Sequence, residues 1–257
     1  MIQKKNKRND AHRNETYGLA VIFAEKKDHQ SIIKPIEIWM KRFCKNGRII
    51  EREEHDMSIV FNKEQIDEVA EELRKGKVIA FPTDTVYGLG VHYFDEKALE
   101  RLKNTKGRPE NKPIPTMVAN LEQLAAVAEI TPAIEKIVAA FLPGALTLVM
   151  KKKANVPSYA TNGLDTIGVR MPDDPFVLSL IEKSGGPMFV TSANRSGEPT
   201  GTTFEEVMAQ LDGRMDGIVK GTCGCLNAST IIDVTGDQIK VLREGPISKE
   251  DIEKALQ

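Results

Sequence analysis

Residues 78–90 read VIAFPTDTVYGLG, and this stretch sets the class of the fold. Its first four residues, Val78 to Phe81, form a short apolar run that is typical of a buried strand. Thr83, Asp84 and Thr85 follow in a turn bounded by glycine, and such hydroxyls and a carboxylate suit recognition of a polar small molecule. The same groups could instead bond their own backbone as a closed turn. The motif alone therefore leaves both interpretations open.

The alternation of strand, turn and helix continues through the rest of the chain. Helices are predicted to begin at capping residues Asn62, Asp95, Asn120, Thr131, Asp174, Thr203 and Ser248. Further strands are predicted at residues 145–150, 166–171, 187–191, 229–234 and 239–242. Interleaved helices and strands predict an α/β fold of the mixed, α+β type, with a mixed sheet.

The composition divides the chain in two. Of its 257 residues, the first 56 hold 13 Lys+Arg against 9 Asp+Glu, and the remainder holds 23 against 28. Residues 1–57 are predicted to be an N-terminal extension, poorly ordered or non-native, and residues 58–257 a single domain. One hypothesis places the natural start at Met57, and the alternative is a small family-specific appendage. Intact mass of the natural product distinguishes them.

Cysteine usage and hydropathy limit the compartment and the chemistry. Three cysteines, Cys44, Cys223 and Cys225, are too few for a disulfide framework and suit a reducing cytoplasm. Cys223 and Cys225 have no nearby His or second Cys pair, so they cannot complete a tetrahedral zinc site. No apolar stretch reaches the roughly 20 residues of a membrane span. A sequence pI near 6.5 argues against a polybasic nucleic-acid binder but allows a local basic groove.

A cationic loop follows the helix that Asp95 begins. Residues 106–113 read KGRPENKP, and the two prolines favour extended geometry in the residues before them. In an extended chain Lys106 and Arg108 share one face, with Lys112 close by. Three cations on one short loop suit a polyphosphate. The alternative is a solvated run of charges.

A second polar turn follows the predicted strand 187–191. Residues 191–200 read TSANRSGEPT, in which Ser192 and Asn194 are also two residues apart. A hydroxyl and an amide can contact a base, a ribose or a phosphate oxygen. Serine-hydrolase chemistry is disfavoured, because the G-x-S-x-G elbow is missing and His92 is the only histidine after residue 57.

Arg170 is the most informative of the remaining polar residues. It lies among the apolar residues of a predicted strand, so its guanidinium needs an anionic partner. That partner is either a substrate carboxylate or a structural ion pair with Asp173 or Asp174. A P-loop and a dinucleotide-binding G-x-G-x-x-G turn are both missing from the sequence.

Taken together, these clusters resemble the YrdC family, the L-threonylcarbamoyladenylate synthases, from about residue 66 to residue 256. Residues 82–90 are similar to its P-T-[DE]-T-x-Y-G-L-G motif and residues 106–108 to its K-x-R signature. Four further motifs follow in order, at residues 143–147 (P-G-x-x-T), 169–172 (V-R-x-P), 192–197 (S-x-N) and 229–233 (S-T-[IV]-[IV]-D). Six motifs in the same order make the resemblance specific.

The resemblance implies a fold and a reaction. Members have a twisted mixed sheet between helical layers, with an open concave groove. They are nucleotidyltransferases that convert L-threonine, bicarbonate (or CO2) and ATP into threonylcarbamoyl-AMP and pyrophosphate. The product serves N6-threonylcarbamoylation of adenosine 37 in tRNA, through downstream threonylcarbamoyl transferase machinery, with a further tRNA contact allowed. Mg2+ would be carried by the ATP phosphates.

The resemblance also implies roles for single residues. Lys106 and Arg108 would be catalytic. The ATP-binding residues would be Arg108, Lys112, Thr166, Ser192, Asn194, Thr200 and Arg243. The threonine-binding residues would be Thr85, Arg170 and Ser229. The chain departs from the family pattern at Met117, where many members have His, and in the loop 220–228.

Two alternatives to the synthase remain. A non-catalytic, YrdC-like binder of tRNA or double-stranded RNA would use the same groove, and its affinity would fall steeply with salt. An enzyme that adenylates another amino acid or carbamate would share the ATP site. Pyrophosphate release with and without threonine tests the synthase. Salt-dependent RNA affinity tests the binder, and turnover across the amino acids, with threonine as the reference, tests the other adenylating enzyme.

Overall fold

The computed structural model describes residues 44–45, 48–49, 57–109, 112–224 and 227–256. Glu110, Asn111 and Cys225 lie outside the described residues, as does most of the predicted extension. The chain divides into two compact units, Met1–Asp56 and Met57–Gln257. In the first unit, β1 (Cys44–Lys45) and β2 (Arg48–Ile49) pair antiparallel.

The second unit is built on a mixed ten-stranded sheet of order β12-β11-β7-β8-β6-β9-β5-β4-β10-β3. Its strands are β3 (Ile59–Phe61), β4 (Ile79–Phe81), β5 (Gly88–His92), β6 (Thr116–Met117), β7 (Leu146–Lys151), β8 (Thr166–Arg170), β9 (Met188–Ser192), β10 (Gly217–Val219), β11 (Thr230–Asp233) and β12 (Lys240–Arg243). β11 pairs parallel with β7, whereas β8 pairs antiparallel with β7. The predicted mixed α/β class is confirmed.

The helices begin where the capping residues predict. They are α3 (Ile66–Arg74), α4 (Glu96–Lys106), α5 (Leu121–Val127), α6 (Pro132–Phe141), α7 (Pro175–Ser184), α8 (Phe204–Leu211) and α9 (Lys249–Leu256). The side chains of Asp95, Asn120, Thr131, Asp174 and Thr203 each accept a hydrogen bond from the backbone three residues on. Asn62 and Gln65 form the predicted capping box over a 3-10 turn, Lys63–Gln65, that leads into α3.

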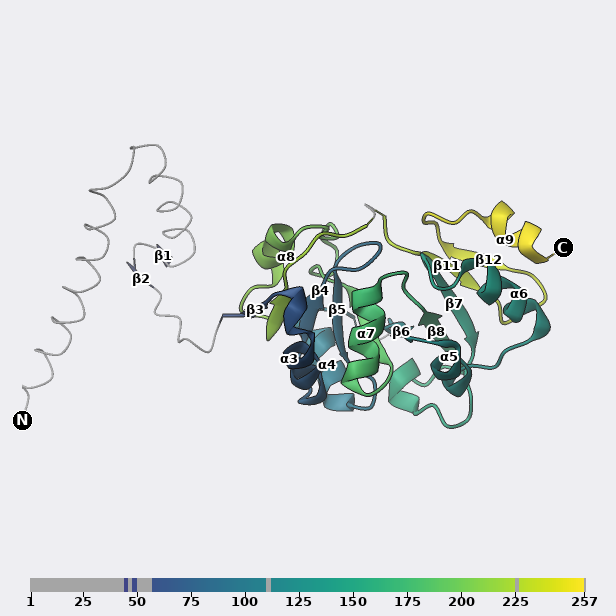
Figure 1. Cartoon of the computed structure of the whole chain (residues 1–257), viewed down its shortest axis with the longest axis horizontal. Coiled ribbons are helices and arrows are strands. Elements are labelled where there is room, and N and C mark those ends of the chain that lie inside the picture. The colour runs from purple at the N-terminus through teal and green to yellow at the C-terminus, as the bar shows by residue number, and fades with distance from the viewer. Residues whose placement is uncertain (1–43, 46–47, 50–56, 110–111, 225–226, 257) are drawn as a thin grey trace, which may run out of the picture. The chain divides into compact units, whose positions relative to one another are not determined.

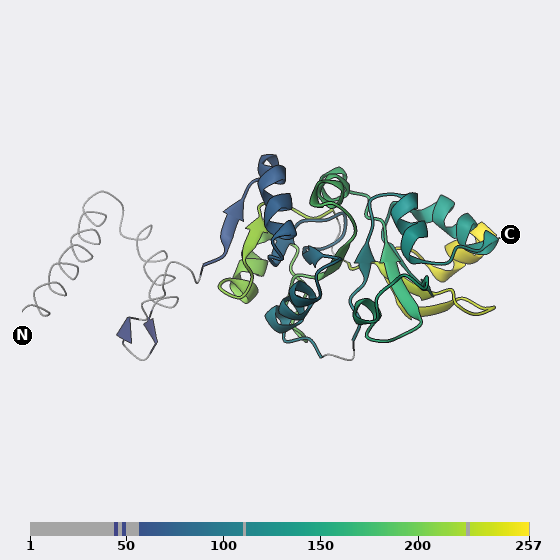
Figure 2. The same ribbon diagram turned by 90° about the horizontal axis from the view of Figure 1, so that it is seen from below.

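Helices cover both faces of the sheet at its β3 end. Leu73 of α3 and Leu180 of α7 pack against Phe81 and Val190 on one face. On the other face α4 and α8 contribute to the larger core, which includes Leu89 of β5. Figure 1 shows α3, α4 and α7 gathered at this end, and Figure 2 shows α3 and α4 on opposite sides of the strands.

At the β12 end, one face of β7, β8 and β11 packs on α5, α6 and α9, through core residues such as Leu148 and Val169. The alternate residues point to the opposite face, because side chains alternate along a strand. These residues line a cavity of about 190 Å³, whose walls include Thr147, Val149, Thr166, Gly168, Ile231, Leu242 and the segment Pro113–Pro115.

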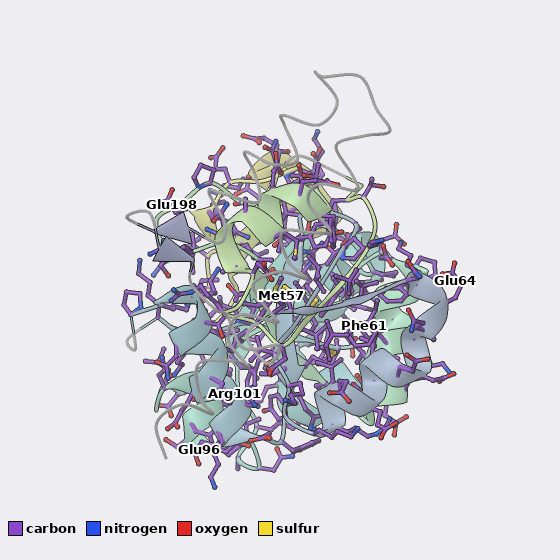
Figure 3. All side chains as sticks on the ribbon, turned by 90° about the vertical axis from the view of Figure 1, so that its left-hand side faces the viewer. Met57, Phe61, Glu64, Glu96, Arg101 and Glu198 are labelled. Carbon is purple, nitrogen blue, oxygen red and sulfur yellow. The ribbon has the colours of Figure 1, made fainter. Side chains whose placement is uncertain are left out.

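Four strands of the sheet, β3, β5, β6 and β10, are not predicted from the sequence. The sequence does not indicate β5, because its first residues, Gly88-Leu89-Gly90, are typical of the end of a turn. A Cβ at Gly88 would lie 2.9 Å from the Val190 side chain, and one at Gly90 would lie 2.9 Å from Met188 and from the Phe81 ring. Glycine at both positions therefore permits this strand packing. β3 is an edge strand, with Met57 just before it, Phe61 at its end and Glu64 in the turn that follows (Figure 3). No helix among the described residues is long and apolar enough to cross a membrane.

Candidate functional site

The turn after β4 is fixed by bonds within itself and to its neighbours. Thr83 Oγ1 donates to the carbonyl of Val86 at 2.8 Å and accepts from the backbone of Thr85 at 3.1 Å. The hydroxyl of Tyr87 lies 2.9 Å from the Gly221 carbonyl and 3.1 Å from that of Val219. The self-bonded turn considered for this motif is therefore present at Thr83. The side chains of Asp84 and Thr85 also make contacts outside the turn.

The guanidinium group of Arg170 binds the side chains of both Asp84 and Thr85. Its Nη2 lies 2.7 and 2.8 Å from the two carboxylate oxygens of Asp84, its Nη1 donates to Thr85 Oγ1 at 2.9 Å, and its Nε donates to the Gly144 carbonyl at 3.2 Å. The alternative ion pair with Asp173 or Asp174 is wrong. Asp174 instead caps α7 by accepting from Val177. Burial lowers the pKa of Arg170, and Asp84 opposes this shift.

Ser229 and Arg243 form a second cluster at the start of β11. Ser229 Oγ lies 2.9 Å from Thr147 Oγ1, which is in the wall of the cavity. Arg243 Nη2 donates to the Ser229 carbonyl at 2.7 Å and lies 3.1 Å from its hydroxyl. Burial lowers the pKa of Arg243, and the positive charge of Arg170 adds to the effect. The guanidinium groups of Arg170 and Arg243 are therefore close enough for their charges to interact.

Lys106 is a buried cation without a carboxylate partner among the described residues. Its Nζ donates to the Asn194 carbonyl at 2.7 Å, to Asn194 Oδ1 at 3.0 Å and to the Ser192 carbonyl. Its side chain is nearly inaccessible, with 3% of the residue exposed. Burial, with a contribution from Arg108, lowers the pKa of Lys106 to about 7. A buried ammonium in neutral surroundings favours a bound anion.

Ser192 and Asn194 are hydrogen-bonded to each other on the turn after β9. Ser192 Oγ donates to Asn194 Oδ1 at 2.6 Å. The Asn194 amide nitrogen donates to the carbonyls of Arg195 at 2.9 Å and Glu198 at 2.7 Å. These bonds hold the turn after β9 against the end of α4, where Lys106 lies.

Arg108 contacts the wall of the cavity through its guanidinium group. Its Nε donates to the carbonyl of Lys112 at 3.1 Å and its Nη2 to that of Pro113 at 2.9 Å, and Pro113 lines the cavity. Extended geometry from Lys106 onward is wrong, because Lys106 is the last residue of α4. Gly107 ends that helix in the left-handed region, with φ of 61°. The two cations nevertheless lie close enough to interact.

The other candidates are less closely engaged. Thr166 begins β8 and lines the cavity. The Lys112 side chain is exposed, and Thr200 is half-buried in the loop between β9 and α8.

Within the described ranges, no group of three His, Cys, Asp or Glu residues could hold a metal ion. Sequence reasoning did not include Asp84 among the site residues, although its place in the turn was a usable signal.

Comparison with known proteins identifies the family. A family model for Sua5, YciO and YrdC proteins, described as "Telomere recombination", matches residues 71–245. The chain belongs to this family. All eleven candidate residues lie within the matched region.

Named relatives come from archaea and bacteria. The chain is 41% identical to the threonylcarbamoyl-AMP synthase of Pyrococcus abyssi, over 78% of this chain and 61% of the relative. It is also 41% identical to that of Bacillus subtilis, over 76% and 57%. The crystal structure of P. abyssi Sua5 complexed with L-threonine matches with a TM-score of 0.74 and 40% identity, over 77% of this chain and 61% of that one. The chain thus spans about three fifths of these relatives' length.

Proposed function

We propose that the protein is an L-threonylcarbamoyladenylate synthase, a nucleotidyltransferase. It would join L-threonine, bicarbonate and ATP into threonylcarbamoyl-AMP, with release of pyrophosphate and water. The observation that carries this proposal is that two groups of cationic and hydroxyl residues each contact a residue in the wall of one cavity. Thr147, next to Ser229, and Pro113, next to Arg108, both line that cavity. The names of the relatives support the same activity.

The amino acid would bind at the Arg170 cluster, by which we mean Thr85, Arg170 and Ser229. Thr85 and Ser229 supply hydroxyls, Arg170 supplies a guanidinium, and the second guanidinium, of Arg243, lies close enough to interact with it. A substrate carboxylate suits this set, because guanidinium and hydroxyl groups both donate to carboxylate oxygens. The complex of the related P. abyssi Sua5 with L-threonine is consistent with such a ligand.

ATP would bind at the Lys106 cluster and across the cavity. Lys106 and Arg108 would face the phosphates, Ser192 and Asn194 would shape the turn beside them, and Thr166 in the cavity wall would contact another part of the nucleotide. Lys112, Thr200 and Arg243 complete the proposed nucleotide contacts. Mg2+ would enter with ATP as part of the substrate, since the described residues of the site offer no carboxylate cluster for it.

The chain's residues would act by alignment and charge neutralisation. The carbamate of threonine attacks the α-phosphorus of ATP, and the bond from that phosphorus to the β-phosphate bridging oxygen breaks. Negative charge develops on the leaving pyrophosphate. Fixed cations in a buried site stabilise that charge and lose little by reorganisation, and holding both reactants side by side removes much of the entropic barrier.

The product has a defined use in this proposal. Threonylcarbamoyl-AMP would pass to a tRNA threonylcarbamoyl transferase, which modifies adenosine 37. We propose that residues 58–257 perform the reaction, because every candidate residue lies there. The low cysteine count favours the cytoplasm as the compartment.

Pyrophosphate release by the full chain tests the proposal. Release from ATP is expected only when L-threonine and bicarbonate are both present. Lys183→Gln should leave this release unchanged, because Lys183 pairs with Asp67 on the surface. It is therefore the control for variants that remove a charge at Lys106 or Arg108. Release that ignores threonine, or that prefers another amino acid, would refute the assignment. Salt-sensitive RNA binding without turnover would favour the RNA-binding alternative.

A further inference from the structure

We infer that Asp84 binds the α-ammonium group of the amino-acid substrate while Arg170 binds its carboxylate. Asp84 thereby selects α-amino acids over carboxylates that lack an amine. The inference rests on the proposed function and deepens it, because it names the group that recognises the second charge of the substrate.

The first support is the geometry of the ion pair. Both oxygens of Asp84 lie within 2.8 Å of Arg170 Nη2, and the side chains are only 12% and 6% exposed. An ionised carboxylate has about four acceptor positions, so one guanidinium nitrogen leaves acceptor capacity unused. An ammonium group brings three donors and can share these oxygens with Arg170.

The second support is the rigidity of the backbone around Asp84. The Gly224 backbone donates to the Thr83 carbonyl at 3.2 Å. A Cβ at Gly224 would lie 2.7 Å from the Asp84 carbonyl oxygen, so the two backbones are in close contact. Together with the Thr83 and Tyr87 bonds, this packing places the carboxylate at Arg170 before any ligand arrives.

The third support is the balance of charge. Around Arg170 the groups other than Asp84 are one hydroxyl, one carbonyl and the neighbouring cation Arg243. Among these partners Asp84 alone is anionic, and Asp174 is engaged as a helix cap. An ammonium placed beside two guanidinium groups would be repelled without it. A zwitterion is neutral, and so is the Asp84–Arg170 pair, so their contact buries no net charge.

Binding of two matched ligands to the full chain tests the inference. The ligands are L-threonine and 2,3-dihydroxybutanoate, in which a hydroxyl replaces the amine. The wild-type chain should bind threonine at least about tenfold more tightly, as for a charge-assisted hydrogen bond. Equal affinity of the wild-type chain for the two ligands overturns the inference without any variant.

Two variants then separate recognition from positioning. Asp84→Asn should weaken threonine binding by about tenfold or more while the affinity for dihydroxybutanoate changes much less. Asp84→Glu keeps the charge and should retain most of the discrimination. Asp216→Asn is the control, because Asp216 pairs with Arg101 away from the cavity. Thermal melts of each variant report on folding.

Two other outcomes contradict the inference. An equal loss for both ligands in Asp84→Asn would mean that Asp84 only positions Arg170. A gain for both would mean that Asp84 competes with the substrate carboxylate. If the wild-type chain shows no threonine-dependent pyrophosphate release, the proposed function itself fails. Normal turnover with either contrary binding result removes the inference alone.

Discussion

Arg170 and Lys106 are both buried cations, but their surroundings differ. Arg170 has a carboxylate partner in Asp84, whereas Lys106 contacts only carbonyl oxygens within the described residues. A paired charge is stable without ligand and suits a neutral zwitterion. A buried charge among neutral oxygens is costly unless an anion arrives. The surroundings of the two cations therefore favour two ligands of different charge.

The largest expected effect is on folding stability. Arg170→Met leaves the Asp84 carboxylate buried without its partner, which should lower the free energy of unfolding by about 3–5 kcal/mol. Lys106→Met removes a charge for which the described residues provide no carboxylate partner, so its cost should be smaller, about 1–3 kcal/mol for the lost donors. Urea unfolding at neutral pH measures both.

A double variant checks the physical reason for this difference. Adding Asp84→Asn to Arg170→Met removes the orphaned charge and should recover part of the lost stability. If Arg170→Met and Lys106→Met cost the same, or if the double variant is the least stable, the distinction between paired and unpaired cations is wrong.

The next effect concerns the nucleotide end. Arg108→Ala should lower kcat/KM for ATP, because a charge-assisted contact to the developing negative charge is lost. The expected loss of transition-state stabilisation is about 1.5–3 kcal/mol. Lys112→Ala should cost less, since the Lys112 side chain is exposed. Initial rates of pyrophosphate release give both values. A larger loss for Lys112→Ala than for Arg108→Ala would contradict the proposed geometry.

Much of the fold could be predicted because local signals and tertiary structure agree. The capping residues mark helix starts through bonds to residues only three positions away, so the sequence alone contains both partners. The strands β7, β8 and β9 are apolar enough to be recognised. β6 has two residues and β10 three, and such short strands are defined by their neighbours in the sheet.

The candidate site was less accessible to sequence reasoning. Ser192 and Asn194 could be selected as candidates because both lie on one short turn, and there the two side chains are hydrogen-bonded. The partner of Arg170 was sought nearby, at Asp173 and Asp174, but Asp84 is 86 positions away in the chain. The burial of Lys106 could not be predicted from the sequence either, because it depends on the packing of α4 against the turn after β9. Long-range pairing was the missing information.

The third effect is a dependence of ATP affinity on pH. With a pKa lowered to about 7, Lys106 loses its charge in the free protein as pH rises through neutrality. ATP favours the charged form, so binding above pH 7 requires proton uptake. The dissociation constant for ATP should then rise, by up to about tenfold per pH unit. Titration calorimetry between pH 6 and 9 measures this trend.

Lys106→Arg is the control for that dependence. Arginine stays charged over the whole range, so its ATP affinity should be flat above pH 7. ATP's own titration affects both proteins equally and cancels in the comparison. A wild-type curve parallel to that of Lys106→Arg would show that Lys106 does not titrate near neutrality.

The smallest effect comes from an ion pair on the surface. Lys183 Nζ lies 2.5 Å from Asp67 Oδ1, closer than Arg170 Nη2 lies to Asp84, but the side chains are 42% and 79% exposed. Water screens such a pair, so Lys183→Gln should change the free energy of unfolding by less than about 1 kcal/mol. Urea unfolding in low and high salt measures it. A loss comparable to that of Arg170→Met would mean that distance, rather than burial, decides how much a charge pair matters in this fold.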